Sequence, residues 1–184
     1  MRIIAGSAGR KTIKVPGAVA RPTTDFVRQA MFSILGESVI DAPVADLFSG
    51  SGALGLEALS RGASSCVFVD DSHQATKIIR DNLVTTGLTG GRIVLSDVLT
   101  FLKRDIGSYG LIFADPPYAK SPLDTEWIGK ILNSGFLEPR LSDNGIFYSE
   151  ISRTTATPDA PAWKLIDRRN YGSSSILLYQ KCGA

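Results

Sequence analysis

The chain has 184 residues, 43% of them hydrophobic, and a formal net charge of +2. No apolar run approaches the roughly 18 residues that a membrane helix needs, and the N-terminus shows no secretion signal, so we expect a cytoplasmic protein. Cys66 and Cys182 are widely separated without CxxC spacing and His73 is the single histidine, which argues against a metal site and for plain core or surface thiols.

The first segment of the chain is basic. Residues 1–30 carry six basic side chains and one acidic one. Residues 2–15 alternate around a glycine-containing turn and predict a short hairpin. Because a basic arm can grip a polyanion, Arg10 and Lys11 are candidate RNA contacts, and a solvated hairpin face is the alternative.

An amphipathic helix is predicted next. Thr24 can cap its N-terminus, and apolar residues recur with helical spacing from Val27 to Leu35. Gly36 then ends the helix. We therefore expect one face of this helix to be buried.

From residue 44 onward, short apolar strands alternate with helical segments. Near-continuous apolar runs are typical of parallel strands that are buried on both faces. The strands are expected at 44–48, 66–70, 92–96, 111–115 and 145–150, the helices at 53–61, 72–86, 98–103 and 125–132, and a closing antiparallel hairpin at 163–169 and 175–181. This pattern predicts a doubly wound, Rossmann-like α/β fold in a single domain, with an extension over 1–40 and a core over 41–184.

A glycine-rich loop follows the first of these strands. Gly50, Gly52 and Gly55 form a G-x-G-x-x-G pattern that opens a helix, which by spacing alone favours a dinucleotide such as NAD. However, Asp46 lies near the end of the strand, two residues before the turn, where its carboxylate would face a pyrophosphate, and like charges would repel. S-adenosylmethionine has no phosphate and carries an ammonium and a sulfonium, which a carboxylate attracts. The loop therefore favours S-adenosylmethionine, and we include Phe48 among the expected cofactor contacts.

Acidic residues follow the next two strands as well. Asp70 is placed to accept hydrogen bonds from ribose hydroxyls, and Asp71 is the competing candidate for that role. Asp97 is placed to accept a hydrogen bond from the adenine amine. Each acid alone could be a helix cap or a surface charge. Three acids at three successive strand ends, along the edge where such folds bind ligands, predict a nucleoside site.

The fourth strand ends in Asp115, Pro116, Pro117 and Tyr118. The amine of a nucleobase is a poor nucleophile because its lone pair is delocalised into the ring. Acceptance of both amine hydrogens by the Asp115 carboxylate and the Pro116 carbonyl would return electron density to nitrogen, while Tyr118 stacks on an unpaired base. The two prolines fix φ and donate no competing N–H. This corner predicts methyl transfer to an exocyclic amine.

With these motifs, the chain resembles the RsmD-type 16S ribosomal RNA (guanine-N2)-methyltransferases of bacteria over nearly its whole length. The resemblance rests on VADLFSGSGALGLEALSRGA, LIFADPPY, the N-terminal RIIAG and GRK segments, RPTTDFVRQAMFSIL at 21–35 and YGSSSILLYQ at 171–180. It implies a class I methyltransferase fold, a catalytic core over 41–184, and methylation of guanine N2 in the 16S rRNA of an assembling small subunit. It further implies that the RNA-facing residues, besides those of the basic arm, are Arg21, Thr23, Thr24, Arg28 and Tyr171.

The sequence departs from the family pattern at Phe26 and Gln29, where a basic and an acidic residue are more usual, which could alter an RNA contact. Ser49 and Asp70 replace a usual alanine and glutamate and keep the chemistry. A DNA base or a protein glutamine could be the acceptor instead, an NAD-dependent oxidoreductase could share the fold, and a nucleic-acid-binding protein could carry an inactive cofactor site. We expect a monomer without a metal.

Overall fold

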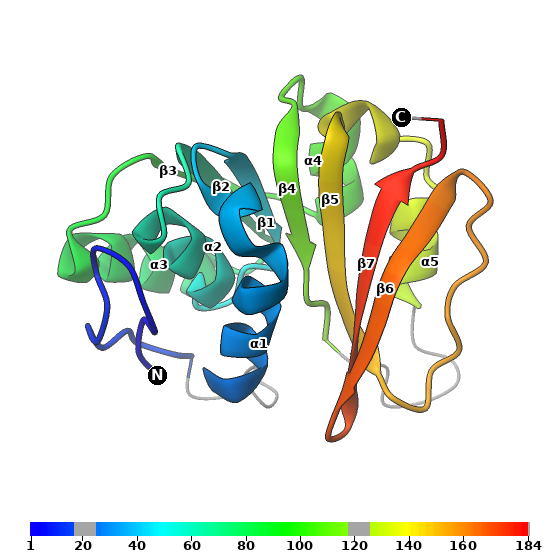
Figure 1. Ribbon diagram of the computed structural model, residues 1–184. Helices are drawn as coiled ribbons and strands as arrows, with labels where there is room; N and C mark the ends of the chain where they lie inside the picture. The colour runs from blue at the N-terminus through cyan, green and yellow to red at the C-terminus, as the bar shows by residue number, and fades with distance from the viewer. Residues whose placement is uncertain (17–24, 118–125, 184) are drawn as a thin grey trace.

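The computed structural model of the protein describes residues 1–16, 25–117 and 126–183 (Figure 1). Within these residues a seven-stranded sheet has the order β3-β2-β1-β4-β5-β7-β6, in which β5, β7 and β6 pair antiparallel and the other neighbours pair parallel. The strands are β1 (Pro43–Leu47), β2 (Ser65–Asp70), β3 (Gly91–Leu95), β4 (Tyr109–Ala114), β5 (Leu141–Ser152), β6 (Trp163–Tyr171) and β7 (Ser174–Lys181). The predicted mostly parallel α/β sheet with a closing hairpin is confirmed.

Helices cover both faces of the sheet. They are α1 (Asp25–Leu35), α2 (Ala53–Ser60), α3 (His73–Thr86), α4 (Val98–Arg104) and α5 (Trp127–Leu132), with short 3-10 turns η1 (Gly36–Val39) and η2 (Glu138–Arg140). The apolar faces of α1, α2 and α3 pack into one core and those of α4 and α5 into another. Figure 1 shows the first group in front of the sheet and the second behind it.

The strand sequences divide their side chains between these two cores. Along β4, Leu111 and Phe113 join the core beneath α1 to α3, whereas Ile112 and Ala114 join the core beneath α4 and α5. Side chains of a strand point alternately to opposite faces, so a run of consecutive apolar residues supplies both cores. This is the physical reason for the near-continuous apolar runs in the sequence.

Strand β3 departs from the expected pattern. It was predicted to be buried on both faces, but its residues are exposed or half-buried, and Leu95 is 44% exposed. The reason is its place at the edge of the sheet, where it has β2 as its only neighbour. The expected N-terminal hairpin is present in irregular form: one bridge joins Arg2 to Thr12, and backbone hydrogen bonds join Ile3 to Arg10 and Lys11 and Met1 to Ile13.

The order of the strands reverses between β1 and β4. From β1 the chain first builds outward through β2 and β3, and then returns to place β4 on the other side of β1. Ligands of doubly wound folds bind outside the carboxyl ends of the strands at such a switch point. Among the described residues no helix is long and apolar enough to cross a membrane.

Candidate active site

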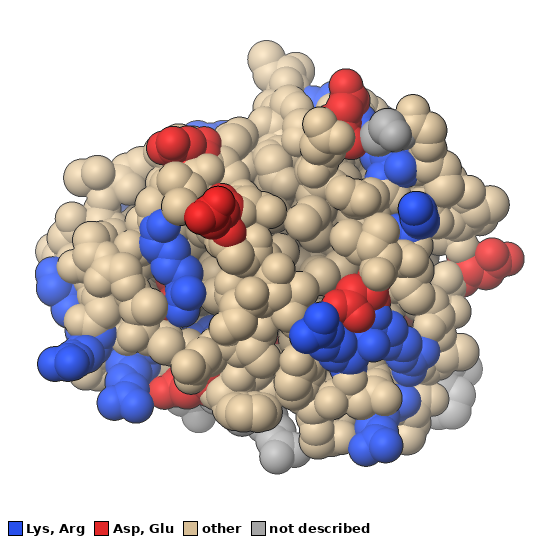
Figure 2. Space-filling model, in the orientation of Figure 1, with Lys and Arg blue, Asp and Glu red and all other residues tan. Residues whose placement is uncertain are grey.

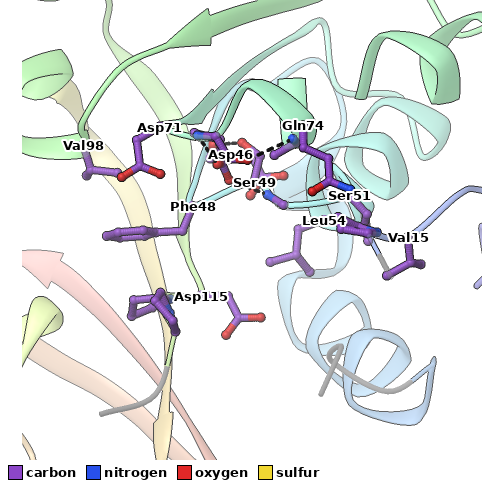
Figure 3. A pocket seen from close by; sticks show the side chains of 18 of the residues that line it. Val15, Asp46, Phe48, Ser49, Ser51, Leu54, Asp71, Gln74, Val98 and Asp115 are labelled. Carbon is purple, nitrogen blue, oxygen red and sulfur yellow. Dashed lines mark hydrogen bonds between the residues drawn. The ribbon is translucent and has the colours of Figure 1, made fainter. Parts of the chain in front are cut away.

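A cavity of about 340 Å³ opens at the carboxyl ends of β1, β2, β3 and β4 (Figure 3). This size lies within the range of small-molecule sites. The predicted site residues that line it are Arg28, Asp46, Phe48, Gly50, Asp70, Asp97, Asp115, Pro116 and Pro117. The fold therefore gathers residues from four strand ends and from α1 around one space.

The glycine-rich loop begins with a strained residue, and the helix that follows the loop donates a hydrogen bond to a buried carboxylate. Phe48 has φ 58°, in the left-handed region that non-glycine residues seldom adopt, and Gly50 follows with φ 54°. Such strain commonly lies at ligand sites. The side chain of Asp46, only 2% exposed, turns toward α2, where Oδ2 accepts a 2.9 Å hydrogen bond from the Gly55 N–H. The carboxylate and the loop thus hold each other in place.

The electrostatic setting of Asp46 is unfavourable without a cationic ligand. Burial raises its pKa well above the ordinary value, and the negative charges of Asp115 and Asp70 raise it further, while the hydrogen bond from Gly55 opposes the shift. A buried carboxylate that faces two others gains from a nearby positive charge. The site therefore favours a cation over a phosphate, as the sequence predicts.

Asp70 ties the end of β2 to the glycine loop. Its Oδ2 accepts a 2.8 Å hydrogen bond from the Gly50 N–H, and its Oδ1 accepts one of 2.9 Å from the Ser72 N–H. Each carboxylate oxygen can accept a second hydrogen bond. The neighbouring Asp71 is exposed and lies on the cavity wall too. The structure brings both candidate ribose ligands to the site.

Asp97 has a structural role beside its place in the cavity wall. Its Oδ1 accepts a 2.8 Å hydrogen bond from the Thr100 N–H and so caps the N-terminus of α4. The helix-cap role that the sequence left open for such acids is thus present in the structure. Because Asp97 also lines the cavity, the cap holds the carboxylate at the carboxyl end of β3.

The corner after β4 faces the other end of the cavity. Asp115 is half-buried, Pro116 is buried and Pro117 is exposed. In Figure 3 the Asp115 carboxylate points into the space between the Phe48 side of the cavity and Leu54. The ring of Phe48 packs edge-on against Trp127 of α5 with centroids 5.3 Å apart. Trp127 also lines the cavity and was not predicted, since nothing in the sequence pattern marks it.

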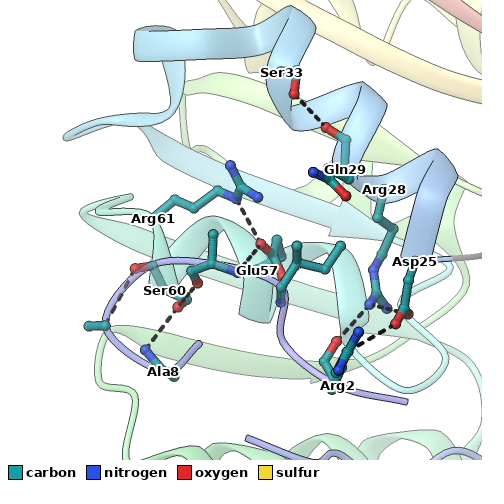
Figure 4. A network of polar contacts seen from close by, with 12 residues as sticks. Arg2, Ala8, Asp25, Arg28, Gln29, Ser33, Glu57, Ser60 and Arg61 are labelled. Carbon is teal, nitrogen blue, oxygen red and sulfur yellow. Dashed lines mark hydrogen bonds and ion pairs between the residues drawn. The ribbon is translucent and has the colours of Figure 1, made fainter. Parts of the chain in front are cut away.

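The N-terminal arm, residues 1–16, closes one side of the cavity. Met1, Val15 and Pro16 contribute to the wall. The arm is anchored by the fully buried Glu57, whose carboxylate accepts hydrogen bonds from the N–H groups of residues 4 and 5 at 2.7 and 3.0 Å (Figure 4). No pattern in the sequence indicates that this glutamate in α2 serves the arm.

Asn82 of α3 links the arm to the glycine loop. Its Oδ1 accepts a 2.8 Å hydrogen bond from the Lys14 N–H, and its Nδ2 donates to the carbonyls of Lys14 and Ser51 at 3.0 and 2.9 Å. The side chain is fully buried. One amide therefore satisfies three backbone groups from two segments that both border the cavity.

The comparisons with known proteins agree with this geometry. The family model described as "Conserved hypothetical protein 95" matches residues 1–180. The chain belongs to this family.

Among its relatives is ribosomal RNA small subunit methyltransferase D of Escherichia coli (strain K12), 33% identical over 98% of this chain and 90% of the relative. The provisionally named rRNA methyltransferase YlbH of Bacillus subtilis (strain 168) is 34% identical over the full length of both chains. A solved structure of a hypothetical protein from Thermus thermophilus has a TM-score of 0.81 at 31% identity and covers 98% of this chain and 99% of its own. The resemblance to RsmD-type proteins is confirmed.

The expected RNA contact of Arg28 requires a correction. Arg28 is fully buried, donates a 2.7 Å hydrogen bond to the carbonyl of Arg2, and pairs with Asp25 at 2.9 Å (Figure 4). Burial lowers its pKa, and the charges of Asp25 and Glu57 oppose that effect. Since it has no exposed surface, Arg28 holds α1 against the arm instead of presenting a cation to RNA.

The other expected RNA contacts have different surroundings. Arg10 is exposed, and Lys11 donates a 2.7 Å hydrogen bond from Nζ to the carbonyl of Thr86 at the end of α3. Tyr171 is half-buried at the end of β6. Arg21, Thr23 and Thr24 lie outside the described residues, as does Tyr118. RNA binding by these residues stays a prediction.

Two of the three motif glycines do not touch the cavity. Gly55 packs α2 against β2, because a Cβ there would lie 2.4 Å from Cε1 of Phe68 and 2.5 Å from Sγ of Cys66. Gly52 precedes α2 with φ 77°. Of the three, only Gly50 lines the cavity, and a Cβ on it would make one ordinary van der Waals contact, 3.9 Å from the Phe48 carbonyl oxygen. Gly52 and Gly55 thus have structural roles in the loop and helix, and their contacts with the cofactor stay a prediction.

The residues present fit S-adenosylmethionine. Its sulfonium and ammonium suit the buried Asp46 carboxylate, and its ribose suits the carboxylates at the end of β2. Its carboxylate suits Arg28, whose Nε and Nη1 have no hydrogen-bond partner in the described part of the chain although the residue borders the cavity. A buried donor without a partner is costly, so an anionic group at this wall would be stabilised.

Proposed function

We propose that this protein is an S-adenosylmethionine-dependent RNA methyltransferase that modifies the exocyclic N2 amine of a guanine in small-subunit rRNA. The observation that carries the proposal is the position of Asp115 and Pro116 on the wall of the cavity that also holds Asp46, Asp70 and Asp97. The carboxylates proposed to bind the nucleoside of the cofactor and the corner proposed to bind the acceptor amine therefore border one cavity. The names of the relatives from E. coli and B. subtilis support rRNA as the substrate.

The carboxylates along the sheet edge would hold the cofactor. Asp70 would accept hydrogen bonds from the ribose hydroxyls, with Asp71 beside it as the alternative, and Asp97 would accept one from the adenine amine. Asp46 attracts the positive charge near the glycine loop. When bound, S-adenosylmethionine supplies a methyl group on a positively charged sulfur. The residues of this chain orient the acceptor toward that carbon and exclude water from it.

The corner after β4 would activate the acceptor. The Asp115 carboxylate and the Pro116 carbonyl each accept a hydrogen bond from the guanine amine, which holds the nitrogen lone pair toward the methyl group. A nitrogen–carbon bond forms as the carbon–sulfur bond breaks. The methylated nitrogen would then lose one proton to Asp115 or to solvent, and the demethylated cofactor would depart as a neutral thioether. Because loss of this proton neutralises the positive charge on the methylated nitrogen, no additional base is needed.

Oxidation or reduction with NAD is the less favoured alternative function for the same fold. A pyrophosphate at the loop would face the buried Asp46 and the charge of Asp70, whereas phosphate sites supply donors and positive charge. Isothermal titration with S-adenosylmethionine and with NADH separates the two readings. Binding of NADH with no binding of S-adenosylmethionine would reject our proposal.

We predict that Asp115→Ala lowers methyl transfer by at least about 100-fold and leaves the affinity for S-adenosylmethionine nearly unchanged, because the lost acceptor stabilises the reacting amine. The measurement uses labelled methyl donor and small ribosomal subunits from a strain that lacks the corresponding gene. Asp115→Asn, which keeps one acceptor oxygen, should retain more activity than the alanine variant.

Asp143→Asn is the matched control, since Asp143 is a highly exposed acid on β5 that pairs with Lys181. Full activity in Asp115→Ala would contradict the assigned role of this carboxylate. Mass spectrometry of the modified rRNA identifies the acceptor: a methyl group on adenine, on cytosine, on a DNA base or on a protein glutamine in place of guanine N2 would reject the finer assignment.

We also infer that the substrate is RNA within an assembling small subunit, that the chain acts as one domain and as a monomer in the cytoplasm, and that it needs no metal. Among the described residues no cluster of three or more potential metal ligands occurs. Light scattering of the purified protein tests the monomer. Activity on naked rRNA compared with that on partly assembled particles tests the form of the substrate.

A further inference from the structure

The turn between β6 and β7 lies at the same sheet edge as the candidate active site. In the sheet register Ala114, the last residue of β4, is opposite Ser149, and β5 continues to Ser152, which is opposite Ser174 of β7. Asp115 and the β6–β7 turn therefore both extend past the carboxyl ends of the parallel strands. Figure 1 shows the tip of this hairpin beside the first turn of α1.

An exposed aromatic ring lies at this position. Phe26, in the first turn of α1, is 69% exposed, and its ring packs edge-on against Tyr171 with centroids 6.0 Å apart and planes at 74°. A large apolar ring in water has no role in either core of the sheet. However, a ring held in one orientation offers a flat face on which an unpaired base can stack.

Basic residues lie on the segments next to this pair of rings. From residue 151 to the end, the chain has five basic and two acidic side chains. Arg168 and Arg169 are exposed near the end of β6, and the Arg153 N–H donates to the carbonyl of Ser173 at 2.8 Å, which places Arg153 at the turn. Figure 2 shows Lys and Arg side chains gathered over the part of β6 nearest this edge.

The three arginines differ in how much of their charge is available. Arg168 donates to Thr157 Oγ1 at 2.5 Å and so helps to hold the loop before β6. Arg169 pairs with Asp167 at 2.8 Å on the exposed strand, where such pairs are weak. Arg153 forms no ion pair with any described residue. The surface therefore retains positive charge beside the two rings.

We propose that Phe26, Tyr171, Arg153, Arg168 and Arg169 form a second RNA-binding surface, the β6 surface, which holds single-stranded nucleotides that flank the methylated base. Phe26 stacks on one base and the arginines contact phosphates. This inference rests on the proposed function and adds a site to it. Aromatic faces interleaved with cations fit single-stranded RNA, because the rings bind bases of any sequence and the cations bind the backbone.

The first test measures the charge contribution. Filter binding of radiolabelled, protein-free small-subunit rRNA over a range of salt should show weaker binding by the double variant Arg153→Ala/Arg169→Ala. For single-stranded contacts the slope of log affinity against log salt should fall by about 1.4, roughly 0.7 for each phosphate contact. Asp167→Asn should bind rRNA more tightly than the wild type, since it removes the acid that pairs with Arg169.

The second test measures stacking. Phe26→Ala should weaken rRNA binding by roughly 5- to 150-fold with an unchanged salt slope, because one base loses its stacking partner. Phe26→Trp should restore the affinity, which a purely structural role of the residue would not predict. The control is Lys103→Ala/Arg104→Ala, two exposed cations at the end of α4, which runs back toward the amino ends of the strands.

Every variant is also titrated with S-adenosylmethionine, and this separates the two proposals. Wild-type protein that fails to bind S-adenosylmethionine or to methylate the subunit would reject the proposed function. Wild-type protein that does both, while the β6 variants bind rRNA with unchanged affinity and salt slope, would overturn this inference alone. Variants impaired with whole subunits but not with rRNA would indicate docking to a ribosomal protein and would overturn it as well.

Discussion

Gly50 and Gly55 lie in one loop-to-helix segment, and different neighbours constrain them. Gly55 is enclosed, since a Cβ would meet Phe68 and Cys66 at 2.4 and 2.5 Å. Gly50 has space around it but a φ of 54°, which an L-residue adopts only at a cost. Gly55 is thus limited by the packing of α2 against β2, and Gly50 by its backbone conformation at the cavity.

We predict that Gly55→Ala destabilises the protein by about 1–3 kcal/mol, because the added methyl overpacks the space between helix and strand. Gly50→Ala should cost roughly 1–2 kcal/mol through strain at positive φ, and should in addition reduce the affinity for S-adenosylmethionine. Urea unfolding and isothermal titration measure the two effects. If Gly55→Ala were as stable as the wild type, the close packing of α2 on β2 would be wrong.

At the scale of single residues, the sequence indicates which residues belong to the site better than it indicates what each side chain contacts. The acids at the strand ends were predicted from their positions, because parallel strands bring their carboxyl ends together whatever the details of packing. Arg28 was expected to face RNA because the family resemblance implies that role. Its burial depends on Asp25 and on the carbonyl of Arg2 in the arm, and a contact with the arm cannot be inferred from helical spacing.

At the scale of elements, the arm, the glycine loop and α3 form one unit through Asn82. The amide spans two segments that are 37 positions apart in the chain, Lys14 and Ser51, and both border the cavity. Loss of the amide would leave backbone donors and acceptors unpaired in a buried place. A change that disorders the arm should therefore also disorder the glycine loop.

We predict that Asn82→Ala destabilises the protein by about 2–4 kcal/mol and also weakens S-adenosylmethionine binding, since both bordering segments lose their link. Hydrogen exchange should increase in the arm and in the loop together. Asn133→Ala is the matched control, because the Nδ2 of that exposed asparagine also donates to two carbonyls. Exchange that rises in only one of the two segments would contradict the coupling.

The elements themselves were largely predictable. Helix α3 begins after the Ser72 cap and ends at Gly87 in the left-handed conformation, as its sequence indicates. Local signals of this kind need no knowledge of the remaining fold. The exposure of β3 and the approach of Trp127 to Phe48 were not predictable, because they depend on which strand lies at the edge and on how α5 packs.

At the scale of the whole molecule, the carboxylates at the sheet edge make stability depend on pH. The pKa of Asp46 is raised in the folded state by burial and by the charges of Asp115 and Asp70. The unfolded chain therefore releases the Asp46 proton at a lower pH than the folded protein. The contribution of this group to stability is fully present below the unfolded pKa, near about 3.9, and is lost as pH rises through the folded pKa.

We predict that cofactor-free wild-type protein loses stability relative to Asp46→Asn as pH rises above the unfolded pKa of about 3.9, by at most about 1.4 kcal/mol per pH unit for this one proton. Saturating S-adenosylmethionine should reverse the trend, because its positive charge favours the ionised carboxylate. Urea titrations at several pH values, with and without cofactor, measure both effects. Parallel pH profiles of the two proteins would show that Asp46 does not titrate in this range.

The position of the arm's partners has a consequence for synthesis of the chain. The N–H groups of residues 4, 5 and 14 donate to Glu57 and Asn82, which are synthesised later, so the arm is made well before the side chains that hold it. At about 5–20 residues per second, the interval between residues 14 and 82 lasts roughly 3–14 s. During that delay the arm has no native site, and the nascent chain exposes the apolar side chains that the arm later buries.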